Sequence, residues 1–171
     1  AETAKTQDDA VLAYLPQLRA KLYFQWQKYD EALRFCENFL IHYEKNKKAV
    51  TPILLYMIHI YTFLGEHDKA TAHTYLLQGM LGKNAELLSA MGEVAHYQNR
   101  HEDARKHFEE ALWYKTHFAP ALYGLGRYWA CQNQMAKAVD YLEKAVMYDP
   151  NLLEASEDLL KIKQKIAQER K

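Results

Sequence analysis

The sequence repeats itself with a spacing of 34 residues, and this period limits the folds that the chain can adopt. Shifting the chain by that spacing superimposes small and apolar residues in three successive copies. The superimposed sets include Ala70, Ala104 and Ala138; Leu54, Leu88 and Leu122; and Met57, Met91 and Leu125. Three consecutive units follow, at 51–84, 85–118 and 119–152. Self-similarity at such a period is typical of arrays in which each repeat stacks on its neighbours.

A fourth, weaker copy precedes these three at a different spacing. Tyr23 and Ala32 come 38 residues before Tyr61 and Ala70, so four extra residues separate the first unit from the second. We expect the Lys-rich stretch 45–50 to hold them, either in a longer second helix of the first unit or in a loop.

Within each unit the apolar residues recur at intervals of three and four, which indicates amphipathic helices. One such series is Leu54, Met57, Ile58, Tyr61 and Leu64. Small residues at recurring positions, such as Gly92 and Gly126, would let neighbouring helix backbones approach closely. The chain has only six Gly and four Pro, which suits helices joined by short loops.

Capping residues mark the expected helix boundaries. Thr51 followed by Pro52 predicts one helix start, and Asn84 and Asn151 predict two further N-caps. Gly65 and Gly82 stand where helices are expected to end.

The last regular copy carries a known motif most completely. It reads Ala121-Leu122-Tyr123-Gly124-Leu125-Gly126-Arg127-Tyr128-Trp129, followed by Ala138, Leu142, Ala145 and Asp149-Pro150. In these residues, and from about residue 13 to 152, the chain resembles the tetratricopeptide repeat (TPR) family. Departures from the family pattern are Ile58 at a usually small position, Thr74 at a usually aromatic one, and Pro16 and Phe39 in the first copy.

The resemblance implies an all-α fold, a right-handed α-solenoid of antiparallel helix pairs with about four TPR units and a C-terminal solvating helix. The expected segments are 1–9, without an apolar period and expected to fray; 10–50, the degenerate first unit; 51–84, 85–118 and 119–150, three regular units; and 151–171, the solvating helix and tail. The closing helix should turn one apolar face inward and a lysine-rich face outward. Its predicted inner residues are Leu152, Leu153, Leu159, Ile162 and Ile166.

Charge and hydropathy exclude two classes of partner. The chain has 22 basic and 22 acidic residues and no net charge, whereas binding to nucleic-acid phosphates needs a basic surplus. Its apolar runs are far shorter than the roughly 18 residues of a membrane-spanning helix. We therefore expect no nucleic-acid binding and no membrane insertion.

No arrangement of reactive side chains predicts catalysis. Cys36 and Cys131 form no spaced motif and are interpreted as free thiols, at least partly buried. The sequence has no nucleophile-elbow, phosphate-loop or dinucleotide motif. It therefore predicts a protein that is not an enzyme and needs no cofactor.

The eight histidines do not have the spacing of metal ligands. His101 and His107, for example, are six residues apart and point to different sides of a helix. His59 and His96 should lie on one side of adjacent repeats, but Glu93 is the one obvious further donor. We expect no metal site, and favour contact with a partner for these two histidines.

In the TPR family, partner segments usually bind the concave face, which the first helix of each pair lines. Carried over to this sequence, the resemblance assigns to that face Tyr14, Gln17, Lys21, Phe24, Leu55, Tyr56, His59, Phe63, Ser89, Glu93, His96, Tyr97, Tyr123 and Arg127. Its aromatic character suits an extended or helical segment with apolar anchors. The family's carboxylate clamp of Lys and Asn is missing, since only Lys21 and Arg127 are basic. A ligand that ends in acidic residues is therefore not expected.

The resulting hypothesis is a protein–protein interaction scaffold or adaptor that binds a peptide or helical segment of a partner protein within a larger assembly. Two alternatives stay open. One is a dedicated, secretion-type chaperone of a single client. The other is a module that self-associates through an apolar N-terminal end formed by Leu12, Leu15, Leu18 and Leu22. The chain begins with Ala-Glu rather than Met, so we expect processing or a longer parent protein. The cytoplasm is the default compartment, with the periplasm or export left open.

Overall fold

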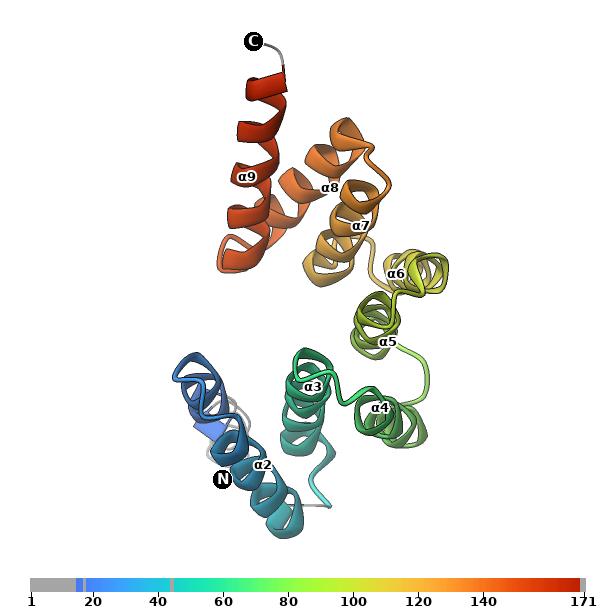
Figure 1. The fold of residues 1–171 in the computed structure, drawn as a ribbon. Coiled ribbons are helices and arrows are strands. Elements are labelled where there is room, and N and C mark those ends of the chain that lie inside the picture. Colours follow the sequence, from blue (N-terminus) through green and yellow to red (C-terminus); the bar gives the residue numbers. More distant parts are fainter. Residues whose placement is uncertain (1–14, 17, 44, 170–171) are drawn as a thin grey trace, which may run out of the picture. The chain divides into compact units, whose positions relative to one another are not determined.

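The computed structural model describes residues 15–16, 18–43 and 45–169. Every regular element among them is an α-helix, and this part of the chain contains no strand, so the predicted all-α fold of helix pairs is confirmed. After a first helix at described residues 15–16 and 18–25, the helices are α2 (Tyr29–Tyr43), α3 (Lys47–Phe63), α4 (His67–Leu81), α5 (Ala85–Tyr97), α6 (His101–Tyr114), α7 (Ala119–Cys131), α8 (Met135–Tyr148) and α9 (Leu153–Glu169) (Figure 1).

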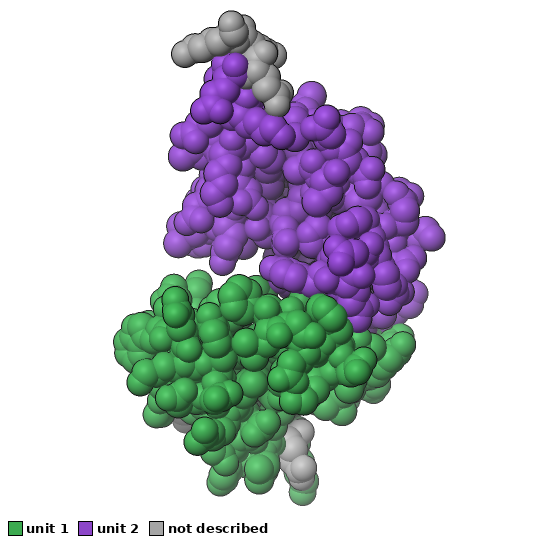
Figure 2. Space-filling view, viewed as in Figure 1, with its two compact units in different colours: residues 1–82 green, residues 83–171 purple. Residues whose placement is uncertain are grey.

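The chain divides into two compact units. Unit 1 comprises residues 1–82 and unit 2 residues 83–171 (Figure 2). The expected fraying of residues 1–9 lies outside the described residues. No described helix is long and apolar enough to cross a membrane.

The turn inside each helix pair has the same backbone conformation. Gln27, Gly65, Asn99 and Asn133 all have a positive φ, between 57° and 76°. In all four turns, the N–H of the following residue donates to the carbonyl five residues earlier, at 2.9 Å. This bond closes the end of the first helix of the pair, as in a Schellman motif. Glycine and asparagine tolerate this conformation best, which leaves Gln27 as the exception.

Glycines end two helices of unit 1 as predicted. Gly65 follows α3, and Gly82, with a φ of 69°, is the C-cap of α4.

Helix α3 contains the four residues that offset the first repeat. It has 17 residues, whereas α5 and α7 have 13 each. It begins at Lys47 because the side chain of Asn46 accepts a hydrogen bond from the N–H of Ala49 at 3.2 Å. The prediction of a helix start at Thr51 and Pro52 is therefore wrong. The Lys-rich stretch thus supplies an additional turn at the N-terminus of α3. It forms neither a loop nor a longer α2.

Helix α3 also provides most of the core of unit 1. Its side chains Ile53, Leu54, Met57, Ile58 and Ile60 are buried, and it packs against both α2 and α4. Four residues of the apolar series identified in the sequence are thus buried, whereas its last member Leu64, the C-cap of α3, is 38% exposed.

The two cysteines lie in different units and different surroundings. Cys36 in α2 is fully buried. Burial, and secondarily the negative charge of Glu37, raises the pKa of its thiol to about 12, so the thiol stays protonated at neutral pH. Cys131 at the end of α7 is exposed, so the prediction that both thiols are at least partly buried is wrong for Cys131.

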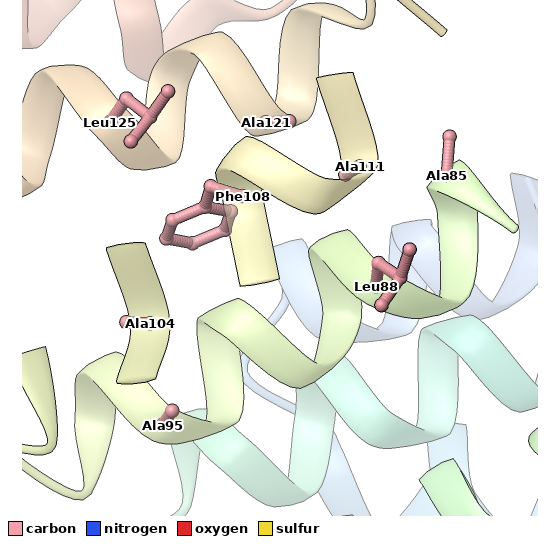
Figure 3. Close-up of a cluster of buried hydrophobic side chains, with 8 residues drawn as sticks. All are labelled: Ala85, Leu88, Ala95, Ala104, Phe108, Ala111, Ala121 and Leu125. Atoms are coloured by element: carbon pink, nitrogen blue, oxygen red, sulfur yellow. The ribbon is translucent and has the colours of Figure 1, made fainter. Parts of the chain in front are cut away.

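The core of unit 2 is built around the ring of Phe108. This side chain from α6 is buried in a cluster with residues of α5, α6 and α7, shown in Figure 3: Ala85, Leu88, Ala95, Ala104, Ala111, Ala121 and Leu125. A Cβ added to Gly92 of α5 would lie 2.6 Å from the Phe108 ring, and one added to Gly124 of α7 would lie closer still. The ring therefore needs a glycine on each of the two neighbouring first helices.

A second cluster holds α9 against α7 and α8. Leu122, Leu142, Ala145 and Ala155 are buried in it, and a Cβ at Gly126 would come within 2.7 Å of Leu142. The small residues recognised in the sequence thus mark close helix contacts.

Of the two N-caps predicted in unit 2, the structure contains one. The side chain of Asn84 accepts a hydrogen bond from the N–H of Leu87 at 2.8 Å, which confirms this cap. Asn151 is not a cap, because α9 begins only at Leu153. The N–H of Asn151 instead donates to the side chain of Asp149 at 3.0 Å, inside the preceding turn.

The closing helix α9 has a different inward face from the predicted one. Leu152, Leu159 and Ile162 pack against the second cluster, as predicted, but Leu153 is 62% exposed. The fully buried residue of this helix is Ala155. At about 100° per residue, Leu153 lies on the opposite side of the helix from Ala155.

Replacing Gly124 by alanine should destabilise unit 2, because the added Cβ would overlap the buried Phe108 ring. We expect a loss of about 1–3 kcal/mol in the free energy of unfolding, measured by urea denaturation. Gly79→Ala in α4 is the matched control, because a Cβ there meets no atom within 4 Å. Alanine in that exposed helix interior should stabilise by about 0.5–1 kcal/mol. A Gly124→Ala variant as stable as the wild type would contradict the close packing.

Candidate functional site

The residues predicted to face a partner fall into two clusters, one within each unit. Tyr14 and Gln17 lie outside the described residues. Phe24, Tyr56, His59 and Phe63 come together in unit 1, and His96, Tyr97, Tyr123 and Arg127 come together in unit 2. Among the remaining predicted residues, Lys21 is exposed, Leu55 is half-buried and Ser89 is buried. Glu93 is half-buried, and its negative charge acts on the His96 imidazole.

The first cluster, here called the ring cluster, consists of Phe24, Tyr29, Tyr56, His59 and Phe63. The Phe24 ring is its centre, with centroid distances of 5.1 Å to Phe63, 5.2 Å to Tyr29, 5.3 Å to His59 and 6.2 Å to Tyr56. Phe63 is 50% exposed. The cluster therefore has a packed centre and an open apolar edge.

Tyr29 is the member of the ring cluster that the sequence analysis missed. It opens α2, the second helix of its pair, and its ring lies 5.5 Å from that of Phe63. A search restricted to first helices could not find it. Tyr29 lies at the start of the second helix, so a search that included second helices could have found it.

The second cluster, here called the arginine–tyrosine cluster, consists of His96, Tyr97, Tyr123, Arg127 and Asp158. The Arg127 guanidinium carbon lies 5.1 Å from the ring centroid of Tyr97 and 5.6 Å from that of Tyr123, within the range of cation–π contacts. The Tyr123 hydroxyl donates to Asp158 at 3.0 Å. Burial is the main cause that raises the pKa of the Tyr123 phenol, so the hydroxyl remains a donor at neutral pH.

Asp158 joins this cluster from α9, outside the helices that the sequence analysis considered. It also forms an ion pair with Lys161 at 3.3 Å. It follows Tyr123 by 35 residues, one more than the repeat spacing, so carrying the period into the closing helix would have pointed to Glu157 instead.

His96 lies beside Arg127 and is uncharged at neutral pH. Burial, then the positive charges of Arg127 and His101, lowers the pKa of the His96 imidazole from 6.5 to about 4. Its ring lies 5.3 Å from that of His101, and within the described residues its buried Nδ1 has no hydrogen-bond partner. The cluster thus combines a cation held over two rings, a carboxylate and a neutral imidazole.

Neither cluster has the composition of a metal centre. Within the described residues, no group of three or more His, Cys, Asp or Glu side chains is placed to hold a metal ion.

In an NMR titration, the His96 ring should titrate near pH 4, and its signal can be assigned with His96→Asn. Arg127→Ala should raise this midpoint, because it removes a neighbouring positive charge, but leave it below 6.5, because burial remains.

The His96 imidazole binds its proton more tightly in the unfolded chain than in the native one. Stability should therefore fall as the pH drops from about 6.5 to 4, and less steeply in His96→Asn. A wild-type midpoint at 6.5 would contradict the described burial.

Comparisons with known proteins agree with this architecture. Residues 119–152 match the family model described as tetratricopeptide repeat. The comparison with curated proteins finds no match.

Three solved structures illustrate the likeness in fold. TTC0263, a thermophilic TPR protein of Thermus thermophilus, is 17% identical, with a TM-score of 0.71 over 88% of this chain and 81% of that chain. PilW, a widely conserved type IV pilus biogenesis factor, is 24% identical, with a TM-score of 0.64 over 91% and 70% of the two chains. PilF of Pseudomonas aeruginosa is 16% identical, with a TM-score of 0.64 over 94% and 72%. The chain therefore has the fold of tetratricopeptide-repeat proteins. The repeat at residues 119–152 also matches that family in sequence, so the expected TPR resemblance is confirmed.

Proposed function

We propose that this chain is a protein–protein interaction scaffold, or adaptor, that binds a peptide or helical segment of a partner protein within a larger assembly. Its fold is generally a non-catalytic protein-interaction module. The proposed contact surface consists of the ring cluster and the arginine–tyrosine cluster, and most of their side chains come from first helices.

The observation that carries this proposal is the position of Arg127 over Tyr97 and Tyr123. An arginine held against two rings loses less conformational freedom on binding than one that extends freely into solvent. Arginine and tyrosine are also enriched among the residues that dominate binding energies. The arginine–tyrosine cluster is thus suited to hold a polar or acidic side chain of a partner.

The ring cluster of unit 1 would supply an apolar contact. The open edge at Phe63 can accept a leucine-sized or aromatic side chain of the partner. Such a contact is favourable because it removes apolar surface of both Phe63 and the partner side chain from water. The two clusters have different chemistry, and we propose that each contributes a separate anchor point. A partner ending in an acidic tail is not required, since the family's carboxylate clamp is missing from the sequence.

A dedicated chaperone of one client remains the alternative, and it would use the same side chains. The two functions differ in outcome, because only a chaperone should raise the solubility of its client when the two are co-expressed. The cytoplasm remains the expected compartment, with the periplasm or export as alternatives.

A photo-crosslinking residue placed at Tyr97 should capture a partner protein in cells of the source organism. The same residue at Lys144, exposed on α8, is the control and should capture it much less. Arg127→Ala should weaken binding of the captured partner at least tenfold, as for a residue that dominates an interface. Circular dichroism would confirm that the variant is folded. Undiminished binding by folded Arg127→Ala would remove this cluster from the interface.

A further inference from the structure

The first helix of unit 1 carries leucines on its outer side. Ala20 is fully buried, and Leu18 and Leu22 lie on the opposite side of the helix, given about 100° per residue. Leu15 continues this stripe at 56% exposed, and Trp26, in the turn after the helix, is 62% exposed. These four side chains are here called the N-face.

The closing helix of unit 2 repeats this arrangement. Ala155 is fully buried, while Leu153 and Leu160, on the opposite side, are 62% and 59% exposed. Glu157 lies between them, at the spacing that keeps the three side chains on one side of α9. Leu153, Glu157 and Leu160 are here called the C-face.

Both faces expose leucine side chains on a helix whose opposite side is buried. Neighbouring exposed apolar side chains typically mark an interaction surface. Each of the two faces therefore needs a partner surface of similar extent.

Charge identifies which surface fits the N-face. The segment 15–28 contains Arg19, Lys21 and Lys28 and no acidic residue. The guanidinium of Arg19 lies 4.9 Å from the Phe35 ring centroid, and it donates to the Tyr23 hydroxyl at 3.3 Å, so its charge is not neutralised in these contacts. Two N-faces brought together would place like charges side by side.

The C-face has the opposite charge. Glu154 and Glu157 belong to the first turns of α9, next to Leu153 and Leu160. The two nearest lysines, Lys161 and Lys163, form ion pairs within unit 2 at 3.3 Å and 2.8 Å. An acidic apolar stripe therefore complements the basic apolar stripe of the N-face.

We infer that the N-face of one copy of this chain binds the C-face of a second copy, head to tail. The contact is heterologous, so each copy that uses one face leaves its other face available. Further copies would therefore add through the faces that are left, and the average mass should rise with concentration.

Sedimentation experiments on the full 171-residue chain test this inference. The wild type should show a weight-average mass that passes twice the chain mass of 20.1 kDa as concentration rises. Leu22→Glu on the N-face and Leu160→Lys on the C-face should each weaken self-association at least tenfold. Mixed in equal amounts, the two variants should form a complex of two chains, because each retains one intact face.

Controls separate the proposed faces from exposed apolar residues in general. Tyr75→Ser in unit 1 and Trp113→Ser in unit 2 remove large exposed rings outside both faces and should leave self-association unchanged. Glu157→Lys should weaken it at low salt, and by a smaller factor at high salt, because salt screens exposed charges. Circular dichroism should show all variants to be folded, since every substituted side chain is exposed.

Three outcomes would overturn the inference. The first is a wild type that stays monomeric at every concentration. The second is a folded Leu160→Lys variant that associates as the wild type does, which would indicate N-face to N-face pairing. The third is a mixture of the two variants that forms no complex.

Discussion

The close contact between the Phe108 ring and two glycines is the constraint on which unit 2 depends. Gly92 and Gly124 belong to α5 and α7, the first helices of consecutive pairs, and the ring from α6 occupies the space that a Cβ would take on either. This single side chain therefore sets how closely three helices approach. Because α7 carries Tyr123 and Arg127, the same contact positions the candidate binding residues relative to Tyr97 on α5.

Most of the fold could be predicted because a repeat supplies the same information several times. The 34-residue spacing, the recurring small residues and the apolar period all describe a contact between neighbouring helices that recurs. Features that occur once were harder to predict. The start of α3 depended on whether Asn46 or Thr51 caps the helix. The rotation of α9 depended on Ala155, instead of Leu153, packing against α7 and α8. Both outcomes follow from packing and local hydrogen bonds that a single sequence does not specify.

The candidate site was predictable to the extent that first helices form it. Phe24, Tyr56, His59 and Phe63 meet within unit 1, and Tyr97, Tyr123 and Arg127 within unit 2, as separate groups. Tyr29 and Asp158 were missed because they come from a second helix and from the closing helix. The pairing of Arg127 with two rings also depends on rotamers, and the helical period indicates only which side of a helix a residue occupies.

The placement of the two cysteines gives each compact unit its own chemical reporter. The thiol of Cys36 is buried between helices of unit 1 and held in the unreactive protonated form, while Cys131 of unit 2 stands at the surface. An alkylating reagent will therefore modify Cys131 in the folded chain and reach Cys36 only when unit 1 opens. The rate of that second modification measures the opening of the N-terminal half alone. Local unfolding of unit 1 can thus be followed in the wild-type chain without introducing a further cysteine.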